Sequence, residues 1–363
     1  MVENKNKIMT GVITKERLRP FLKYLKDDEI TDVDWNGSDL WVKNIYNESI
    51  IIPKEEHDVT SEFIQAFTTH VSNSVSKLFN QENCVLEAET EDYRIECVHE
   101  ARAISGRCCC IRKTTRSPRM SYKYLIDSQY TIVPILNLLI NCCIAKFNFM
   151  IAGEPGVGKT EFAKFLSLFI PDDQRVITIE DSLEWHYKEL KPAADGIELQ
   201  VNDDFSYTEA LKTCMRLNPR RIFLSEVRST EAKSLIECWS NGVKGFSTLH
   251  TDDARKIPDR ILNMMPTRAD AERLKNNVYE NLDIGILINQ KKDENGKNHR
   301  YIEQLCFFER NIEKEENKIF MIVEEGKLIT QEIPQSKIKK LKGVRYFEII
   351  DSLKEKYYET KEG

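Results

Sequence analysis

The chain has 363 residues, of which 41% are hydrophobic and 31% charged, with only 14 Gly and 11 Pro. This composition excludes collagen-like, low-complexity and largely disordered proteins, and the length predicts two domains rather than one. The formal charge of -6 gives no overall electrostatic reason to bind DNA or RNA. We therefore expect a soluble globular protein that does not bind nucleic acid directly.

The ten cysteines do not form a recognisable metal or disulfide pattern. Three are contiguous at 108–110, two at 142–143, and no Cys-x-x-Cys pair is available to chelate zinc. A chain of this length also has no need of disulfide staples. We interpret the cysteines as reduced, mostly buried thiols of a cytosolic protein.

Targeting and membrane-spanning segments are not indicated. The first 21 residues lack the apolar core of a signal peptide. The longest apolar stretch, 132–152, is interrupted by Pro134, Lys146 and three asparagines, which argues against a helix that crosses a bilayer. A helix followed by a buried strand explains this stretch better.

The first 113 residues have the pattern of a small α+β domain. Residues 31–42 alternate apolar and polar positions around Asn36-Gly37, which predicts a β-hairpin. Residues 61–79 carry apolar side chains at helical spacing. Short β-rich segments at 92–97 and 106–112 complete this domain.

A basic, proline-containing linker is expected at 114–128, and a second domain at 129–363. No internal repeat is present. The charged tail after Gly343 has the composition of a solvated terminal helix.

The second domain alternates apolar strands with helical patterns. This order predicts an α/β fold with a mainly parallel sheet, covered by helices on both faces and binding ligands at the carboxyl ends of its strands. The strands are expected at 147–153, 175–181, 221–226 and 246–250, and the helices at 159–169, 207–216 and 230–239.

The segment Gly153 to Thr160 fits the phosphate-binding loop pattern G-x-x-x-x-G-K-[ST]. In such a loop the glycines let backbone N–H groups turn toward phosphate oxygens, Lys159 reaches the terminal phosphates, and the Thr160 hydroxyl ligates Mg²⁺. An apolar strand precedes the loop and an amphipathic helix follows it, as this interpretation requires. The expected nucleotide-binding residues are Gly153, Glu154, Pro155, Gly156, Val157, Gly158, Lys159, Thr160 and Glu161.

Polar residues follow the next three strands. Glu180 and Asp181 end one strand, with Glu184 about one turn later; Glu226 follows a second strand and His250 a third. Each alone is as consistent with a surface cap as with catalysis. Together, after a phosphate-binding loop, they predict a site for Mg²⁺, the attacking water and the γ-phosphate.

These motifs, in this order, resemble a known family. The loop, ITIEDSLE, LKTCMRLNPRRIFLSEVRSTEA and GFSTLHTDDA are similar to the Walker A, Asp box, atypical Walker B and His box of the traffic ATPases of type II secretion, type IV secretion, type IV pili and tight-adherence systems. EITDVDWNGSDLWV and DYRIECVHEARAISGRCCCIRKT are similar to the family's N-terminal domain, which packs over the nucleotide. The resemblance spans about residues 28 to 310 and implies a RecA-like ATPase core.

The resemblance also implies roles for individual residues. Glu184 or Glu226 orients or deprotonates the attacking water, and the other holds Mg²⁺ through water, so that Glu226 stands with Thr160 as a metal ligand. Glu180 and Asp181 support them, and His250 contacts the γ-phosphate or relays its loss.

Two arginines of the first domain are implied as well. Arg94 and Arg112 match the family's N-terminal arginines, which reach the terminal phosphates. An arginine on a strand is otherwise a solvated or salt-bridged side chain.

The chain departs from the family pattern at Glu154-Pro155, at Glu161 and at Ser225, where Thr, Thr and Gly are common. None of these changes removes a phosphate or metal ligand named above, but they leave the turnover rate and the subfamily open.

By resemblance, the protein is a cytoplasmic, Mg²⁺-dependent ATPase that forms a homo-oligomeric ring, expected to be a hexamer. It would attach to a membrane-embedded platform through protein contacts and power a secretion, conjugation or pilus-type machine. The machine, its cargo and the direction of force stay open. Two alternatives remain: a ring ATPase that translocates nucleic acid or remodels proteins, and a nucleotide-gated assembly factor with negligible turnover.

Overall fold

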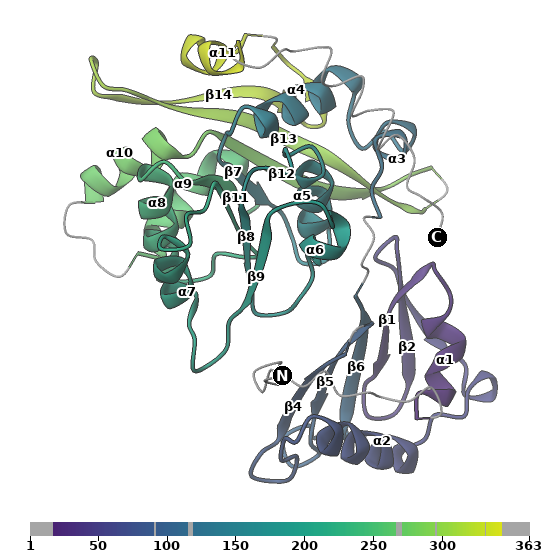
Figure 1. The fold of residues 1–363 in the computed structure, drawn as a ribbon. Helices are drawn as coiled ribbons and strands as arrows, with labels where there is room; N and C mark the ends of the chain where they lie inside the picture. The colour runs from purple at the N-terminus through teal and green to yellow at the C-terminus, as the bar shows by residue number, and fades with distance from the viewer. Residues whose placement is uncertain are drawn as a thin grey trace. The chain divides into compact units, whose positions relative to one another are not determined.

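A computed structural model describes residues 17–90, 92–114, 119–265, 271–294, 296–330 and 332–342. The chain divides into two compact units, Met1–Thr115 and Arg116–Gly363, each of which has its own sheet (Figure 1). The charged tail after Gly343 lies outside the described residues.

The first unit is built on a six-stranded antiparallel sheet in the order β3-β2-β1-β6-β5-β4. The predicted hairpin is confirmed: β1 and β2 pair around Asn36-Gly37, and Gly37 has a φ of 108°, which glycine adopts without a steric penalty. The elements are α1 (Arg19–Leu25), β1 (Ile30–Trp35), β2 (Leu40–Asn44), β3 (Ser49–Ile52), η1 (Lys54–Glu56), α2 (Ser61–Ser74), β4 (Val85–Glu89), β5 (Tyr93–Val98) and β6 (Cys108–Lys113).

Helix α2 begins where the sequence predicts and ends five residues earlier. The Thr60 side chain caps it by accepting a hydrogen bond from the Phe63 N–H. Ser76 has a φ of 54°, which ends the helix. Leu78 falls within the predicted helix of residues 61–79 but lies beyond the end of α2, and it is 73% exposed. The helical spacing of apolar residues in the sequence therefore extends beyond the last residue of the helix, which made the predicted helix too long.

The second unit carries a nine-stranded mixed sheet in the order β15-β14-β13-β12-β7-β11-β10-β8-β9. Its strands from β12 to β9 are parallel, which confirms the predicted parallel core, whereas β13, β14 and β15 extend it antiparallel. The strands are β7 (Phe149–Ala152), β8 (Val176–Glu180), β9 (Gly196–Gln200), β10 (Arg221–Leu224), β11 (Lys244–Leu249), β12 (Ile284–Lys292), β13 (Asn298–Asn311), β14 (Glu316–Glu324) and β15 (Lys327–Leu328).

Helices cover both faces of this sheet, as predicted, and each face has its own buried core (Figure 1). Helices α3, α4 and α5 contribute to one core and α7, α8, α9 and α10 to the other. The helical elements are α3 (Tyr122–Asp127), α4 (Val133–Ile144), α5 (Lys159–Ser167), α6 (Tyr187–Leu190), α7 (Tyr207–Cys214), α8 (Glu231–Ser240), η2 (Ala254–Lys256), α9 (Ile257–Asn263), α10 (Ala271–Asn281) and α11 (Gln335–Leu341).

Part of the expected linker is helical. Tyr122–Asp127 forms α3, because Tyr122 and Leu125 are buried in the core of the second unit while the Ser121 side chain caps the helix. The polar and basic composition of the segment led to the prediction of a linker, although these two apolar residues are buried.

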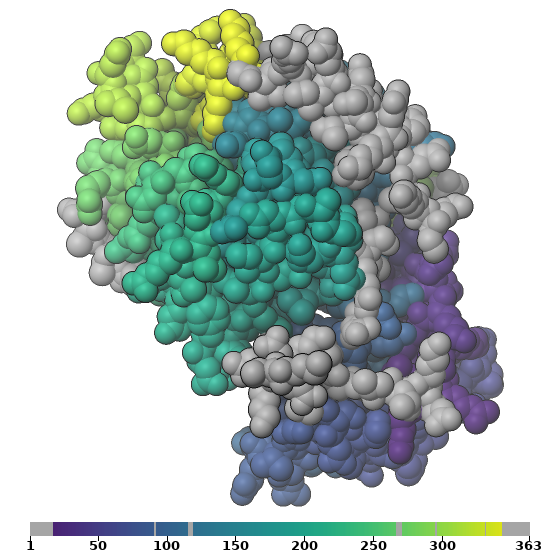
Figure 2. All heavy atoms as spheres, viewed as in Figure 1, coloured from purple at the N-terminus to yellow at the C-terminus, as the bar shows by residue number. Residues whose placement is uncertain are grey.

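Helix α11 lies on the surface of the second unit (Figure 2) and is held there by a buried ion cluster. Asp283, immediately before β12, accepts hydrogen bonds from Lys337 (2.6 Å) and Lys340 (2.9 Å). The Lys340 ammonium also lies 4.2 Å from the centre of the Phe147 ring. Charged residues of α11 thus fasten it to the sheet.

All ten cysteines carry free thiols, and seven of them are buried, which confirms that the thiols are mostly buried. Across the described residues, no helix is both long enough and apolar enough to cross a membrane.

Candidate active site

The phosphate-binding loop connects the end of β7 to the start of α5. Gly153, Gly156 and Gly158 all have positive φ values, of 143°, 79° and 89°, which residues with a Cβ rarely adopt. A Cβ on Gly153 would also lie 2.4 Å from the Ile288 carbonyl oxygen of β12. The glycines therefore fix the path of the loop, and the loop ends where Lys159 begins α5.

Lys159 points back into the loop and is only 8% exposed. Its Nζ donates to the carbonyl oxygens of Gly153 (2.9 Å) and Glu154 (3.0 Å), and lies 3.3 Å from Nδ1 of His250. Burial lowers the pKa of Lys159 to about 8, although the carboxylates of Glu226 and Glu184 partly oppose the shift. An anion placed in the loop would restore the charged form.

Sheet register brings the predicted acidic residues and the histidine to one edge. In the paired strands β8, β10 and β11, Ile179 lies opposite Leu224, and Leu224 opposite Ser247. Their carboxyl ends are therefore level, and the residues that follow them are neighbours. They lie beside the phosphate-binding loop, because the His250 ring contacts the Gly153 carbonyl oxygen.

His250 and Glu226 form the contact at the centre of this edge. His250 Nε2 lies 2.9 Å from Glu226 Oε1, while its Nδ1 lies 2.9 Å from the Gly153 carbonyl oxygen. The ring thus connects the phosphate-binding loop to the carboxylate that follows β10. Glu226 is 16% exposed at its side chain and still accessible to a ligand.

Arg228 forms ion pairs with two of the acidic residues at this edge, and the sequence analysis did not identify it as a site residue. Its guanidinium donates to Asp181 Oδ2 (2.8 Å) and to Glu226 Oε2 (2.9 Å), which raises the pKa of Arg228 further above its ordinary value. Asp181 and Glu226 are thereby linked across neighbouring strands. The only sequence signal was position, two residues after the expected acid.

Glu180 and Glu184 have different surroundings. Glu180 is fully buried, and its Oε1 accepts the backbone N–H groups of Glu184 and Trp185, each at 3.0 Å. Burial raises the pKa of Glu180 well above its ordinary value. It holds the turn that presents Glu184. The Glu184 carboxylate makes no hydrogen bond within the described part of the chain and is half-buried near Lys159.

The departures from the family pattern have structural explanations at two positions. The Ser225 hydroxyl lies 2.9 Å from the Tyr207 hydroxyl, which also accepts the Asp181 N–H. The Glu161 carboxylate accepts from Lys164 (3.3 Å) and from the Arg119 N–H (3.1 Å). Ser225 and Glu161 therefore have partners other than a nucleotide, whereas Glu154 and Pro155 are exposed on the loop.

The residues present fit a nucleotide and Mg²⁺. The Lys159 ammonium is buried inside a glycine-rich turn at a helix N-terminus, the setting that binds phosphate elsewhere. The described residues contain no group of three or more His, Cys, Asp or Glu side chains that would hold a metal alone. Mg²⁺ commonly binds through one or two protein ligands together with water and phosphate oxygens, and Thr160 with Glu226 supplies that number.

In the first unit, Arg94 and Arg112 are neighbours across the β5–β6 pairing, directly opposite each other. Arg112 Nε donates to Asp32 Oδ1 at 2.6 Å. The Arg94 side chain has no hydrogen bond or ion pair within the residues that the structure describes. Glu89 lies directly opposite Arg94 on the β4 side, and Asp32 lies opposite Arg112 on the β1 side, so each arginine has an acidic residue beside it in the sheet. Their role toward nucleotide stays a prediction.

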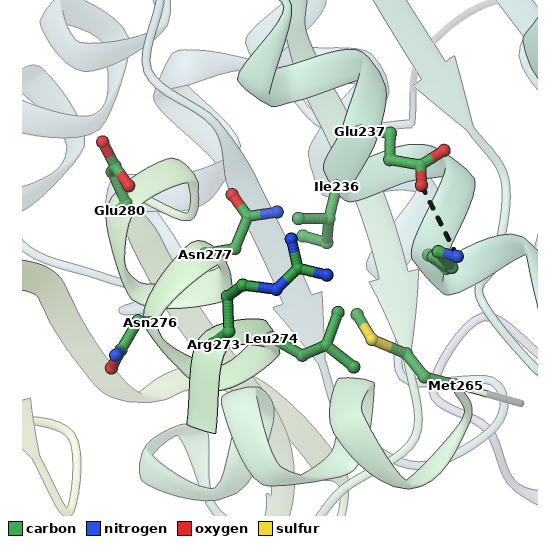
Figure 3. Close-up of a pocket in the computed structure, with 9 residues that line it drawn as sticks. Ile236, Glu237, Met265, Arg273, Leu274, Asn276, Asn277 and Glu280 are labelled. Atoms are coloured by element: carbon green, nitrogen blue, oxygen red, sulfur yellow. Dashed lines mark ion pairs between the residues drawn. The ribbon is translucent and has the colours of Figure 1, made fainter. Parts of the chain in front are cut away.

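Two pockets stand out among the described residues of the second unit. One, of about 740 Å³, is lined by the phosphate-binding loop, His250 and α9. The other, of about 490 Å³, lies between α8 and α10 (Figure 3), where Ile236, Leu274 and Arg273 point toward one another. No predicted site residue lines this second pocket.

Comparisons with known proteins identify the family to which the chain belongs. The model of the family described as "Type II/IV secretion system protein" matches residues 85–290. An uncharacterised protein of Bacillus anthracis is 29% identical over 284 residues, covering 77% of this chain and 62% of the relative. The conjugal transfer protein TrbB of Rhizobium radiobacter is 30% identical over 162 residues, covering 43% of this chain and 47% of the relative. The chain thus spans less than two thirds of the length of these relatives.

Solved structures show the same fold. The ATPase DotB of Legionella pneumophila has a TM-score of 0.60 at 14% identity, covering 86% of this chain and 84% of that one. The pilus retraction motor PilT with bound ADP has a TM-score of 0.55 at 18% identity, covering 79% of this chain and 80% of that one. Both likenesses concern the fold alone.

Proposed function

We propose that this chain, which belongs to the type II/IV secretion system protein family, hydrolyses ATP to power a secretion, conjugation or pilus-type machine at the cytoplasmic face of a membrane. The observation that carries the proposal is the contact series from Lys159 through His250 to Glu226, at the mouth of a phosphate-binding loop. A loop that served only as a turn would not need a buried ammonium facing a histidine and a carboxylate.

In this proposal, Lys159 and the backbone N–H groups of the loop bind the terminal phosphates, and Thr160 with Glu226 holds Mg²⁺. The metal, when bound, neutralises charge on the phosphates and orients them. His250 connects the phosphate site to Glu226. Because the His250 ring contacts both the loop and Glu226, loss of phosphate would be felt at Glu226, and His250 would act as a sensor.

Glu184 is the better base for the attacking water. Glu226 has both carboxylate oxygens paired, one with His250 and one with Arg228, so neither is free to accept a proton from water. The Glu184 carboxylate lies near Lys159 and has no partner within the described residues, and Glu180 holds the backbone of Glu184 in place. Glu180 and Asp181 then act by supporting the turn and by pairing with Arg228.

Arg94 and Arg112 supply charge to the terminal phosphates from the first unit in this proposal. Nucleotide would bring the two units together, and product release would let them part, so hydrolysis becomes movement. The chain would work as a homo-oligomeric ring, with a hexamer proposed from the family, attached to a membrane-embedded platform.

The proposal is tested by steady-state phosphate release with Mg²⁺ and ATP, using Lys159→Ala as the matched control. Turnover in the wild type alone supports it, whereas equal release from both proteins contradicts it. A wild type that binds ATP without turnover would favour the assembly factor. Stimulation by single-stranded DNA would favour a nucleic-acid translocase. The proposed hexamer is tested by measuring the mass of the protein in solution in the presence of ATP.

A further inference from the structure

The Arg228 side chain spans the ends of two neighbouring strands. Its Nη1 bonds Asp181 after β8, and its Nη2 bonds Glu226 after β10, at 2.8 and 2.9 Å. A planar guanidinium donates in two fixed directions, so one side chain can hold two carboxylates at a set separation. The ammonium of a lysine is a single point charge without this fork.

The backbone that carries Arg228 is fixed independently of these ion pairs. The buried Glu231 carboxylate, in the first turn of α8, accepts the N–H groups of Arg228 (2.5 Å) and Ser229 (2.7 Å). The Val227 N–H donates to the Thr248 carbonyl oxygen of β11 at 2.8 Å. The guanidinium therefore extends from an anchored loop rather than from a free one.

Glu226 depends on this anchor for its orientation. One carboxylate oxygen pairs with His250, which is itself attached to the phosphate-binding loop, and the other pairs with Arg228. If His250 turns toward a phosphate, Arg228 becomes the remaining partner that holds the carboxylate. Arg228 itself pairs with Asp181 and Glu226, and among the described residues it makes no hydrogen bond or ion pair to the phosphate-binding loop.

We infer that Arg228 is a positioning residue for hydrolysis: it fixes Glu226 and Asp181 against each other across the strand ends. This inference rests on the proposed ATPase function. It assigns to Asp181 the task of orienting Arg228 rather than contacting water or metal. Because Arg228 acts through Glu226, its loss should lower kcat and leave nucleotide binding almost unchanged.

The test compares Arg228→Gln and Arg228→Lys with Arg175→Gln. Arg175 is a matched control because it also pairs with an aspartate, Asp195 at 3.0 Å, but lies just before β8, at the opposite end of that strand from Asp181. We expect a fall in kcat of about 10- to 100-fold in both Arg228 variants, ADP affinity within about twofold of wild type, and a wild-type kcat in Arg175→Gln. Lysine should not rescue, because one ammonium cannot bridge both carboxylates.

Coupling to Asp181 is measured with the double variant Asp181→Asn/Arg228→Gln. The inference predicts that the double variant has nearly the kcat of Arg228→Gln alone, since both changes break the same bridge. Full additivity of the two effects, full rescue by lysine, or a raised kcat in Arg228→Gln would each overturn the inference. Failure of the proposed function is separate, because then the wild type would release no more phosphate than Lys159→Ala.

Discussion

His250 Nε2 lies 2.9 Å from Glu226 Oε1, and the two residues follow the adjacent strands β11 and β10. The other ring nitrogen of His250 faces the first glycine of the phosphate-binding loop. A phosphate that draws His250 away from this position therefore changes the surroundings of Glu226 at once. In the proposed function, this contact links occupancy of the loop to Glu226.

Substitution of the two carboxylates by glutamine should separate their roles. Glu184→Gln should lower kcat by about 10²- to 10⁴-fold, as loss of a general base does, with ADP affinity retained. Glu226→Gln should lower kcat and also raise the Mg²⁺ concentration needed for half-maximal activity. Phosphate release measured at increasing Mg²⁺ concentrations gives the kcat and the Mg²⁺ requirement of both variants. A Glu184→Gln variant with wild-type kcat would contradict the assignment of the base.

Glu180→Gln should stabilise the protein at neutral and higher pH. Burial raises the pKa of Glu180, so the folded state favours its protonated form, and the unfolded state releases that proton at lower pH. The stability that this group contributes is therefore greatest at low pH and falls as pH rises above the unfolded value. Glutamine removes the dependence.

Thermal unfolding of wild type and Glu180→Gln from pH 4.5 to pH 8 provides the measurement. The difference in Tm should favour the variant and grow with pH. Glu180→Ala is the control, because it also loses the two backbone hydrogen bonds and should be less stable than Glu180→Gln by about 1–3 kcal/mol at every pH. A Glu180→Gln variant that is less stable than wild type at pH 8 would refute the explanation.

Asp283→Asn should loosen the attachment of α11. Burial opposes ionisation of Asp283, but the charges of Lys337 and Lys340 outweigh it and lower its pKa. The stability from this cluster is therefore present above the unfolded pKa and lost as pH falls through the folded value. Removing the buried charge leaves its partners unpaired, at a cost of about 3–5 kcal/mol.

Denaturant unfolding at pH 7 checks this prediction, and repeating it near pH 3 should show a smaller difference from wild type. Lys256→Gln is a suitable control, because its pair with Asp252 is exposed on both sides. An Asp283→Asn variant with wild-type stability at pH 7 would show that α11 is held by other contacts.

Arg94→Ala and Arg112→Ala should each lower kcat strongly, with a smaller change in ADP affinity, if both arginines act on the terminal phosphates. Arg102→Ala is the matched control, since Arg102 is exposed in the loop between β5 and β6. The prediction is checked by measuring kcat for ATP hydrolysis and the affinity for ADP on the same folded proteins. A wild-type kcat in both variants would show that these two arginines of the first unit do not take part in hydrolysis.

The parallel core and the strand-end site could be predicted from sequence because each has a local signal. A glycine-rich loop has a fixed spacing, and buried strands of a parallel sheet are short apolar runs such as Phe149–Ala152. Strand β13 (Asn298–Asn311) was not predicted because only part of it is buried, so neither an apolar run nor a strict alternation marks its full length.

Side-chain partnerships were beyond the sequence. Arg228 resembles any exposed arginine in a loop until the register of β8 and β10 places Asp181 beside Glu226. Lys337 and Lys340 have the appearance of solvated charges, and their partner, Asp283, lies 54 and 57 residues away. Such pairs depend on which residues folding brings together, and residue type and spacing do not encode that.

The most direct test of the account is phosphate release from ATP by the wild type and by Lys159→Ala at equal concentration, with Mg²⁺ present. The account predicts steady turnover in the wild type and none above background in the variant, with far-UV circular dichroism that shows both to be folded. Equal rates in the two proteins would contradict the claim that this loop is the site of ATP hydrolysis.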